Sequence, residues 1–255
     1  MISEYFEAFI LSIVQGVSEF IPVSSSAHLL IISRLSDFSV SNLQLDISLH
    51  LGSLLAIILF FRKELINIIN NKNIFLLIII GSIPLVIIGY IFYSTNLIDQ
   101  FRNLKVVAWT TLIFGVLLYF SDKFELKNKI SSELNIKSII IIGLFQILAI
   151  IPGVSRSGIV ITASRFLKFD RVESSKIAFY LSIPALAGAS VLGFKDVIDD
   201  QINFDTVFIF STLASFLFSY FTIKYFLIYV KMFSLSFFVI YRIVLSIILF
   251  SIIYL

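Results

Sequence analysis

One acid, three serines and one histidine lie close together inside an apolar stretch of the chain. Residues 11–35 read LSIVQGVSEFIPVSSSAHLLIISRL and contain Glu19, Ser24, Ser25, Ser26 and His28. Apolar runs on both sides place this group at membrane depth, where an ionised carboxylate is costly unless it is paired, hydrated or bound to a cation. The stretch therefore predicts a functional site within the bilayer.

A second cluster of the same kind follows 131 residues later. The segment 138–167 has the apolar run IIIIGLFQILAI, then Pro152 and Gly153, then VSRSG. Sliding the chain onto itself superposes identical residues at several positions: Gln15 on Gln146, Ser24 on Ser155, Ser26 on Ser157, Ser33 on Ser164 and Arg34 on Arg165. The match indicates an internal repeat.

Each cluster is predicted to form a re-entrant helical hairpin. Gln15 and Glu19 are four residues apart and share one face of a helix, which Pro22 ends because proline lacks the N–H donor. The serines that follow are favoured N-cap residues for a second short helix. Irregular backbone at membrane depth must line a wet or protein-filled cavity, so we expect the two hairpin tips to enclose one.

The second tip carries groups that suit an anion. Arg156 offers a fixed fork of donors for phosphate oxygens, and glycine allows a ligand to approach the backbone closely. We expect a phosphate-binding set from both tips: Ser24, Ser26, Gly153, Ser155, Arg156, Ser157 and Gly158. Glu19, with Gln15, could hold Mg²⁺ together with phosphate oxygens, or Glu19 could handle a proton.

The chemistry of the first tip allows two nucleophiles. His28 titrates near neutral pH and could transfer a proton. A serine of the 24–26 run could attack phosphorus once activated, or water could attack instead. Structural alternatives remain: Glu19 could only pair with Arg156, and His28 could be a hydrogen-bonded interior residue. His50 is interpreted as structural or interfacial.

Composition supports an all-α, polytopic membrane protein. Of the 255 residues, 59% are apolar and 14% are charged, and the mean hydropathy is +1.04. There is no cysteine, so no thiol nucleophile. Six apolar runs have nearly the length that a membrane span needs, at about 45–61, 74–93, 105–120, 177–193, 206–229 and 236–255.

The loops predict the orientation. If each hairpin returns to the side it entered, loops 62–73, 121–137 and 168–176 share one face, which carries Arg62, Lys63, Lys72, Lys123, Lys127, Lys129, Lys137, Lys168, Arg171 and Lys176. Basic loops are typically cytoplasmic, so the net charge of +3 indicates orientation and not nucleic-acid binding. Three spans between the hairpins make the repeats inverted, with sites near the midplane, and put both termini outside.

We therefore expect one integral membrane domain over residues 1–255. Repeat one covers about 1–120, with its hairpin at 5–35, and repeat two covers about 136–255, with its hairpin at 138–167.

The two motifs QGVSEFIPVSSSAH (15–28) and PGVSRSG (152–158) resemble the signatures of the undecaprenyl-diphosphate phosphatase family, which confers bacitracin resistance. The length of the chain and the order of the motifs also fit. The resemblance implies hydrolysis of undecaprenyl diphosphate, a long-chain prenyl diphosphate lipid, to the monophosphate. This reaction recycles the lipid carrier for peptidoglycan synthesis, cell wall biogenesis and cell shape. It further implies a multi-pass protein of the bacterial cytoplasmic membrane, whose active site faces the outer side.

Residue by residue, the resemblance implies that Glu19 and His28 are catalytic, that Arg156 clamps the phosphate and that a divalent cation, Mg²⁺ or Ca²⁺, takes part. Ser25 is the expected nucleophile or close hydroxyl contact, with Ser24 and Ser26 as alternatives. One departure concerns Val160, where family members often have threonine. Thr162 lies two positions on, about 200° around a helix, so it does not simply replace that hydroxyl.

A lipid-phosphate or anion transporter, or flippase, is the alternative function, because inverted hairpins and an anion site serve transport as well. Glu19 and His28 in the hairpin favour the enzyme. A phosphatidic-acid type of phosphatase needs a histidine after its arginine motif, and no histidine follows Arg156. Membrane lipids are the expected surroundings, and the oligomeric state, including a homodimer, stays open.

Overall fold

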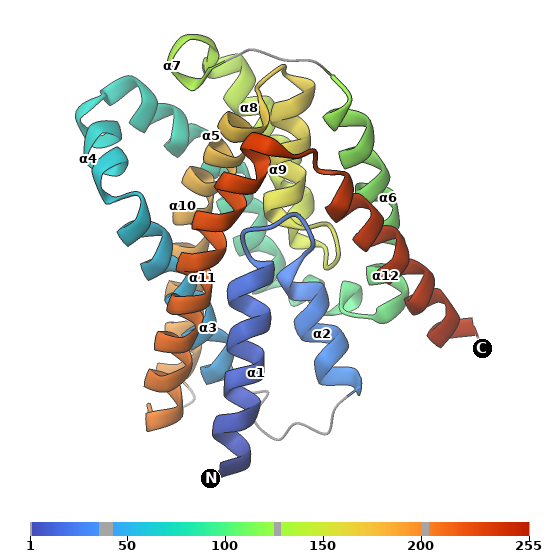
Figure 1. Cartoon of the computed structure of the whole chain (residues 1–255). Helices are drawn as coiled ribbons and strands as arrows, with labels where there is room; N and C mark the ends of the chain where they lie inside the picture. The colour runs from blue at the N-terminus through green and yellow to red at the C-terminus, as the bar shows by residue number, and fades with distance from the viewer. Residues whose placement is uncertain (1, 36–42, 125–128, 200–203, 255) are drawn as a thin grey trace.

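The protein is described by a computed structural model that covers residues 2–35, 43–124, 129–199 and 204–254. Within these ranges every regular element is a helix (Figure 1). The expected all-α class is therefore confirmed.

Two short helix pairs form the hairpins predicted from the sequence (Figure 1). The first pair is α1 (Ile2–Ser18) with α2 (Ser25–Leu35). The second is α8 (Ile136–Ile147), a short turn η2 (Leu148–Ile150) and α9 (Arg156–Phe166). Each arm is too short to cross a bilayer, which needs about 20 residues.

The remaining long helices match the six expected spans. Five are long and apolar enough by themselves: α5 (Lys72–Ser94), α6 (Leu104–Asp122), α10 (Arg171–Asp199), α11 (Thr206–Met232) and α12 (Ser236–Tyr254). The sixth is α3 (Leu43–Phe60), which bends by 73° into α4 (Arg62–Asn70). Short connecting elements are η1 (Leu97–Phe101) and α7 (Ile130–Glu133).

Several spans begin at a side chain that caps the first turn. Asn103 accepts from the N–H of Val106 at 2.9 Å, and Asp205 accepts from the N–H of Phe208 at 2.9 Å. Asn135 forms a reciprocal capping box with Ser138 at the start of α8. These side chains satisfy donors that the first turn of a helix leaves without partners, so the loop residues set where each helix starts.

The outer surface is apolar, as a lipid-facing surface must be. Helix α5 alone exposes many large apolar or aromatic side chains, among them Phe75, Leu76, Ile79, Ile83, Val86, Ile87, Tyr90 and Ile91. A soluble protein rarely leaves such a large contiguous patch in water. Lipid tails cover it here, and the chain is a multi-pass membrane protein.

The two hairpins enter the helix bundle from opposite ends, and their tips meet near its middle (Figure 1). Each hairpin packs on the other half of the chain, because α1 contacts α11 while α8 contacts α5. Helix α6 packs on α12, and α3 packs on α10. In both pairs, a helix of the first half contacts a helix of the second half. The packing is that of interdigitated inverted repeats. The exact repeat boundaries stay a prediction.

One end of the bundle carries the basic loops. Helices α4 and α7 lie towards the upper end in Figure 1, whereas α1 begins and α12 finishes towards the lower end. This arrangement agrees with the loop pairing expected from the sequence. Lys127 lies outside the described residues.

Small residues allow close helix contacts in the interior. Ser53 of α3 lies 3.0 Å from the Ser219 hydroxyl of α11, and Ser215 donates to the carbonyl of Leu49 at 2.7 Å. Between α8 and α5, a Cβ on Gly143 would lie 2.5 Å from the carbonyl oxygen of Gly81. Small side chains and serine hydrogen bonds of this kind drive helix association in membranes.

The α5–α8 contact gives a stability test. We expect Gly143→Ala to lower the free energy of unfolding by about 1–3 kcal/mol, because the added methyl group meets backbone that cannot move away cheaply. Gly89→Ala is the matched control, since a Cβ there meets no heavy atom within 4 Å and alanine favours helix by about 1 kcal/mol over glycine. The midpoint of thermal unfolding in detergent measures both. Equal midpoints for Gly143→Ala and the wild type would contradict this packing.

Candidate active site

The two hairpin tips have the same unusual local geometry. Ser24 and Ser155, equivalent in the repeat, both have a positive φ, at 77° and 73°. Their hydroxyls accept the backbone N–H three residues on, from Ala27 at 3.4 Å and from Gly158 at 3.1 Å. A non-glycine residue with positive φ is strained and needs support from its surroundings. Both serines thus cap the second helix of their hairpin in a conformation that the tertiary structure must hold.

The tips support each other directly. The backbone N–H of Gly153 donates to the Ser24 hydroxyl at 3.2 Å, and the Ser157 hydroxyl donates to the carbonyl of Ile21 at 2.8 Å. The interior around them is apolar, with Phe20 packed edge-on against Phe179 at 5.5 Å between ring centroids. The contacts join residues more than 120 positions apart in the sequence, so the site exists only in the folded protein.

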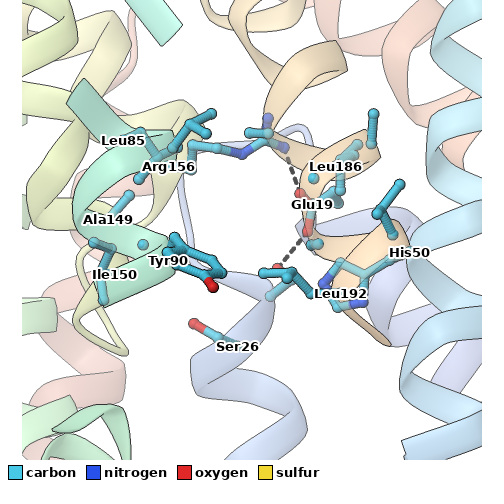
Figure 2. A pocket seen from close by; sticks show the side chains of 18 of the residues that line it. Glu19, Ser26, His50, Leu85, Tyr90, Ala149, Ile150, Arg156, Leu186 and Leu192 are labelled. Atoms are coloured by element: carbon cyan, nitrogen blue, oxygen red, sulfur yellow. Dashed lines mark hydrogen bonds and ion pairs between the residues drawn. The ribbon is translucent and has the colours of Figure 1, made fainter. Parts of the chain in front are cut away.

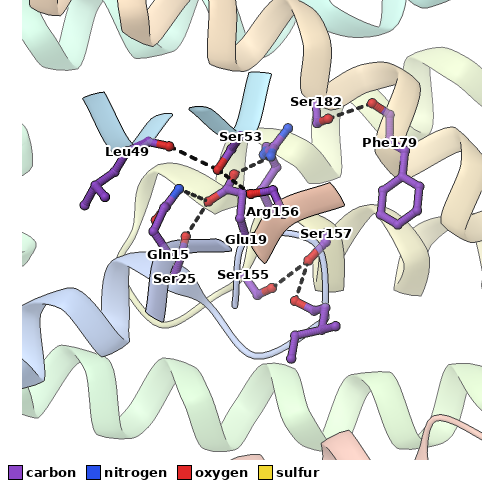
Figure 3. A network of polar contacts seen from close by, with 12 residues as sticks. Gln15, Glu19, Ser25, Leu49, Ser53, Ser155, Arg156, Ser157, Phe179 and Ser182 are labelled. Carbon is purple, nitrogen blue, oxygen red and sulfur yellow. Dashed lines mark hydrogen bonds and ion pairs between the residues drawn. The ribbon is translucent and has the colours of Figure 1, made fainter. Parts of the chain in front are cut away.

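Glu19 is the centre of the polar network between the tips (Figure 3). Its carboxylate accepts hydrogen bonds from three residues: Arg156 Nη2 at 2.5 Å, Gln15 Nε2 at 2.9 Å and Ser25 Oγ at 2.6 Å. The side chain is nearly buried, and Arg156 is its ion-pair partner. The network therefore holds the Ser25 hydroxyl with its proton directed at a carboxylate.

Arg156 keeps donor capacity that the protein does not use. Its Nη2 binds Glu19, whereas its Nη1 is buried and has no hydrogen-bond partner among the residues described. A buried donor without an acceptor is costly. It identifies a place where an anion would be stabilised.

The tips line one wall of a cavity of about 620 Å³. Polar side chains from the hairpins and α3 form one part of its lining: Glu19, Ser24, Ser25, Ser26, His50, Ser155 and Arg156. Apolar residues of α5, α10 and the second hairpin form the rest, including Leu85, Gly89, Ile150, Gly188 and Leu192. Figure 2 shows Glu19 and His50 on one side and Tyr90 and Ile150 on the opposite side. Such a cavity suits an amphiphile with an anionic head.

The two histidines differ in their surroundings. His28 donates Nδ1–H to the carbonyl of Ser24 at 2.6 Å, and its Nε2 lies 2.5 Å from the Tyr241 hydroxyl. It is not among the residues that line the cavity. His50 lines the cavity and uses only Nδ1, which lies 2.7 Å from the carbonyl of Asp46. Because a carbonyl can only accept, Nδ1 carries a proton, whereas Nε2 of His50 has no partner in the described part of the chain. This nitrogen is an acceptor in the neutral ring and a donor in the protonated ring.

The structure thus divides the predicted site residues into two groups. Glu19, Ser24, Ser25, Ser26, Ser155 and Arg156 meet at the cavity as expected. The others support them from outside its lining: Gln15, His28, Gly153, Ser157 and Gly158. Their individual roles in binding or catalysis stay predictions.

The hydroxyl of Thr162 is used inside its own helix. Thr162 Oγ1 donates to the carbonyl of Gly158 at 2.8 Å, and Val160 is fully buried. Thr162 therefore does not supply a hydroxyl in place of the threonine that the family resemblance leads us to expect at position 160.

The donors present set limits on a metal site. No group of three or more His, Cys, Asp or Glu side chains that could hold a metal occurs in the described ranges. Glu19 is the one carboxylate among the described cavity-lining residues, and the buried Oε1 of Gln15 behind it has no partner there. One carboxylate fits a Mg²⁺ or Ca²⁺ ion only if phosphate oxygens and water supply the remaining ligands.

Sequence analysis missed His50 and Arg242 as parts of the site. Arg242 lies in α12, is fully buried and donates to carbonyls of both tips. An arginine inside an apolar span is itself a signal of function, so this residue could have been found. His50 gave no such signal, because only the fold brings α3 beside the first tip.

Comparison with known proteins agrees with this site. Residues 8–248 match the family described as bacitracin resistance protein BacA. An undecaprenyl-diphosphatase of Pelagibacter ubique (strain HTCC1062) is 57% identical over the full length of both chains. Proteins with the same name are 40% identical in Elusimicrobium minutum (95% of each chain) and 36% identical in Alcanivorax borkumensis (88% of this chain and 89% of that one). With a match over nearly its whole length, and with both signature motifs placed at the meeting point of two inverted hairpins, the chain belongs to the bacitracin resistance protein BacA family.

Proposed function

We propose that this protein is an undecaprenyl-diphosphatase, which hydrolyses undecaprenyl diphosphate to undecaprenyl phosphate and inorganic phosphate. The observation that carries the proposal is the cavity itself, which joins the Glu19–Arg156 pair to an apolar wall formed by α5 and α10. Each of the three relatives named above is called an undecaprenyl-diphosphatase. The reaction returns the lipid carrier to peptidoglycan synthesis and accounts for bacitracin resistance.

Binding begins with an exchange at Arg156. In the structure the guanidinium holds Glu19 at 2.5 Å, and Nη1 has no partner among the described residues. A diphosphate offers more negative charge and two-point acceptor geometry, which arginine prefers. Arg156 therefore moves its donors onto the terminal phosphate, and Glu19 is released to act as a base.

Ser25 then attacks the terminal phosphorus. Its Oγ donates to Glu19 Oε2 at 2.6 Å, so the proton passes to the carboxylate as the Oγ–P bond forms. The bond from phosphorus to the bridging oxygen breaks, and undecaprenyl phosphate leaves with the electron pair. Water next attacks the phosphoserine: its oxygen bonds to phosphorus, the Oγ–P bond breaks, and Ser25 Oγ takes back the proton held by Glu19. The proton lost by the water leaves with inorganic phosphate, so both Ser25 and Glu19 are restored. This is the pattern of an activated nucleophile beside its base.

A divalent cation, Mg²⁺ or Ca²⁺, is part of the proposal. Glu19, backed by Gln15, would hold it together with diphosphate oxygens through the carboxylate oxygen that Arg156 gives up, while the oxygen that accepts from Ser25 stays the base. When bound, the ion supplies charge neutralisation of the diphosphate and of the leaving phosphate.

The proposed orientation puts the reaction on the outer side of the bacterial cytoplasmic membrane. The basic loops gather at the end of the bundle that carries α4 and α7 (Figure 1), and this end is assigned to the cytoplasm. The cavity is lined by the halves of α5 and α10 that follow Pro84 and Pro184. These halves approach the opposite end, where the first hairpin enters.

The first prediction concerns the reaction. Purified wild type should release phosphate from a long-chain prenyl diphosphate. The variants Glu19→Gln, Ser25→Ala and Arg156→Met should each lower kcat/KM at least 100-fold, because each removes a group that stabilises the transition state. Chelation should abolish release and Mg²⁺ or Ca²⁺ restore it. A folded wild type that releases no phosphate contradicts the proposal and favours lipid or anion transport through the same cavity.

The second prediction concerns the apolar wall. Gly89 and Gly188 line the cavity, and a Cβ at either position meets no heavy atom within 4 Å. Leucine at these positions should extend from that open space into the part of the cavity expected to hold the prenyl chain. We expect at least tenfold lower kcat/KM for a long-chain diphosphate and less than threefold change for a short, water-soluble prenyl diphosphate. Ile87→Leu, on the lipid-facing side of α5, is the matched control. An equal loss for both substrates contradicts this role.

The third prediction concerns His50. We expect His50→Ala to lower kcat/KM about tenfold, which corresponds to about 1.4 kcal/mol. This is near the lower end for one hydrogen bond to a charged group, and the protonated imidazole would make that bond from Nε2 to a phosphate oxygen. His50→Gln should recover most of the loss, because its amide keeps a donor at the cavity wall. Steady-state kinetics on both variants measure the difference. Wild-type rates in His50→Ala would show that this imidazole does not contact the diphosphate.

A further inference from the structure

Arg242 is a charged side chain in the middle of the molecule without an acid to neutralise it. It is 0% exposed, and among the described residues no carboxylate forms an ion pair with it. All its nitrogens instead donate to backbone carbonyls: Nε to Thr111 at 3.2 Å, Nη1 to Pro22 at 3.2 Å and Val154 at 3.1 Å, and Nη2 to Thr110 at 3.4 Å and Gly153 at 2.9 Å. Burial of a guanidinium is expensive, so this arrangement needs a reason.

The acceptors come from three separate parts of the chain. Pro22 belongs to the first tip, Gly153 and Val154 belong to the second tip, and the two threonines belong to α6. A guanidinium has five N–H donors in one plane, which is the number of carbonyls bound here. Lysine has three donors around a single nitrogen and cannot span the same set.

We propose that Arg242 is a positioning residue. It fixes the position of the two hairpin tips relative to each other, and through them the placement of Ser25 and Arg156. The inference rests on the proposed phosphatase function. The carbonyls that Arg242 binds lie within three residues of Ser25 on one tip and of Arg156 on the other. A shift of about 1 Å in the position of reacting groups can lower the rate about 100-fold. A residue that holds the tips in place therefore keeps the reaction rate high.

The charge of Arg242 serves the same end. Glu19 and Arg156 neutralise each other, so among the described residues Arg242 is a cation behind the tips without an ion-pair partner. A positive charge in a medium of low dielectric constant acts over longer distances than in water. It therefore favours the entry of a diphosphate.

A merely structural arginine is the competing explanation, and kinetics can separate the two. In Arg242→Lys the buried charge is kept while most of the carbonyl contacts are lost. We expect kcat of the folded variant to fall 10–100-fold with KM changed less than threefold, because the charge still attracts the substrate and the tips no longer hold their register. Arg62→Lys is the matched control, since Arg62 is exposed and its one hydrogen bond within the described ranges goes to the carbonyl of Leu59. A structural role would lower thermal stability and leave kcat per folded protein unchanged.

Distance measurements test the tips without substrate turnover. The chain has no cysteine, so Ser33→Cys on α2 and Leu144→Cys on α8, both on exposed sites of the hairpin arms, can take spin labels. We expect one narrow distribution of the distance between the two labels in the protein that keeps Arg242. In Arg242→Lys, this distribution should be broader or shifted. This measurement stays informative if the wild type fails to release phosphate, so the two proposals fail independently.

A second variant perturbs Arg242 without replacing it. A Cβ on Gly115 of α6 would lie 3.1 Å from Arg242 Cβ and 3.4 Å from its Nε, so Gly115→Ala should displace the guanidinium slightly in a helix that alanine itself favours. We expect a 3–10-fold lower kcat and a broadened distribution. The proposal is overturned by kcat within threefold of wild type in Arg242→Lys, and equally by a loss of kcat in that variant with an unchanged distribution.

Discussion

The structure depends on one ion pair at the meeting point of two hairpins. Glu19 from the first tip and Arg156 from the second lie 2.5 Å apart inside an apolar bundle. A buried pair of this kind contributes little to stability compared with well-packed apolar residues, but removal of either member leaves a charge without compensation at membrane depth. Each hairpin therefore supplies the charge that compensates the charge of the other. The net charge of the pair is zero until a diphosphate binds to Arg156.

The rest of the fold protects that arrangement. Of the two strained serines at equivalent tip positions, Ser24 accepts a hydrogen bond from the opposite tip, and the neighbour of Ser155, Ser157, donates to the first tip. Arg242 binds carbonyls of both tips from behind. Interdigitation of the two halves places the tips near the middle of the bundle (Figure 1). The apolar wall of α5 and α10 then extends from the polar groups, so a lipid diphosphate can place its head at the tips and its chain between helices.

Much of this could be predicted from the sequence because the signals are local. Pro22, the serine run and the internal repeat predicted the hairpins, and their inversion followed from an odd number of spans. The convergence of Glu19, Ser25 and Arg156 followed from the hairpins alone. The sequence ranked His28 above His50, but it could not show which imidazole lines the cavity, because that depends on partners such as Tyr241, which is 213 residues away from His28. The open space beside Gly89 and Gly188 is likewise a property of packing, and neither glycine has a sequence pattern that distinguishes it.

The central claim is that Arg156 exchanges the Glu19 carboxylate for phosphate oxygens when the substrate binds. The most direct measurement is the affinity of the detergent-solubilised protein for inorganic pyrophosphate in the presence of a chelator, by titration calorimetry. Glu19→Gln should bind about tenfold more tightly than wild type, a difference of about 1.4 kcal/mol, because its arginine is no longer held by an acid, and Arg156→Met should not bind. Binding by Glu19→Gln that is equal to or weaker than that of wild type would contradict the exchange.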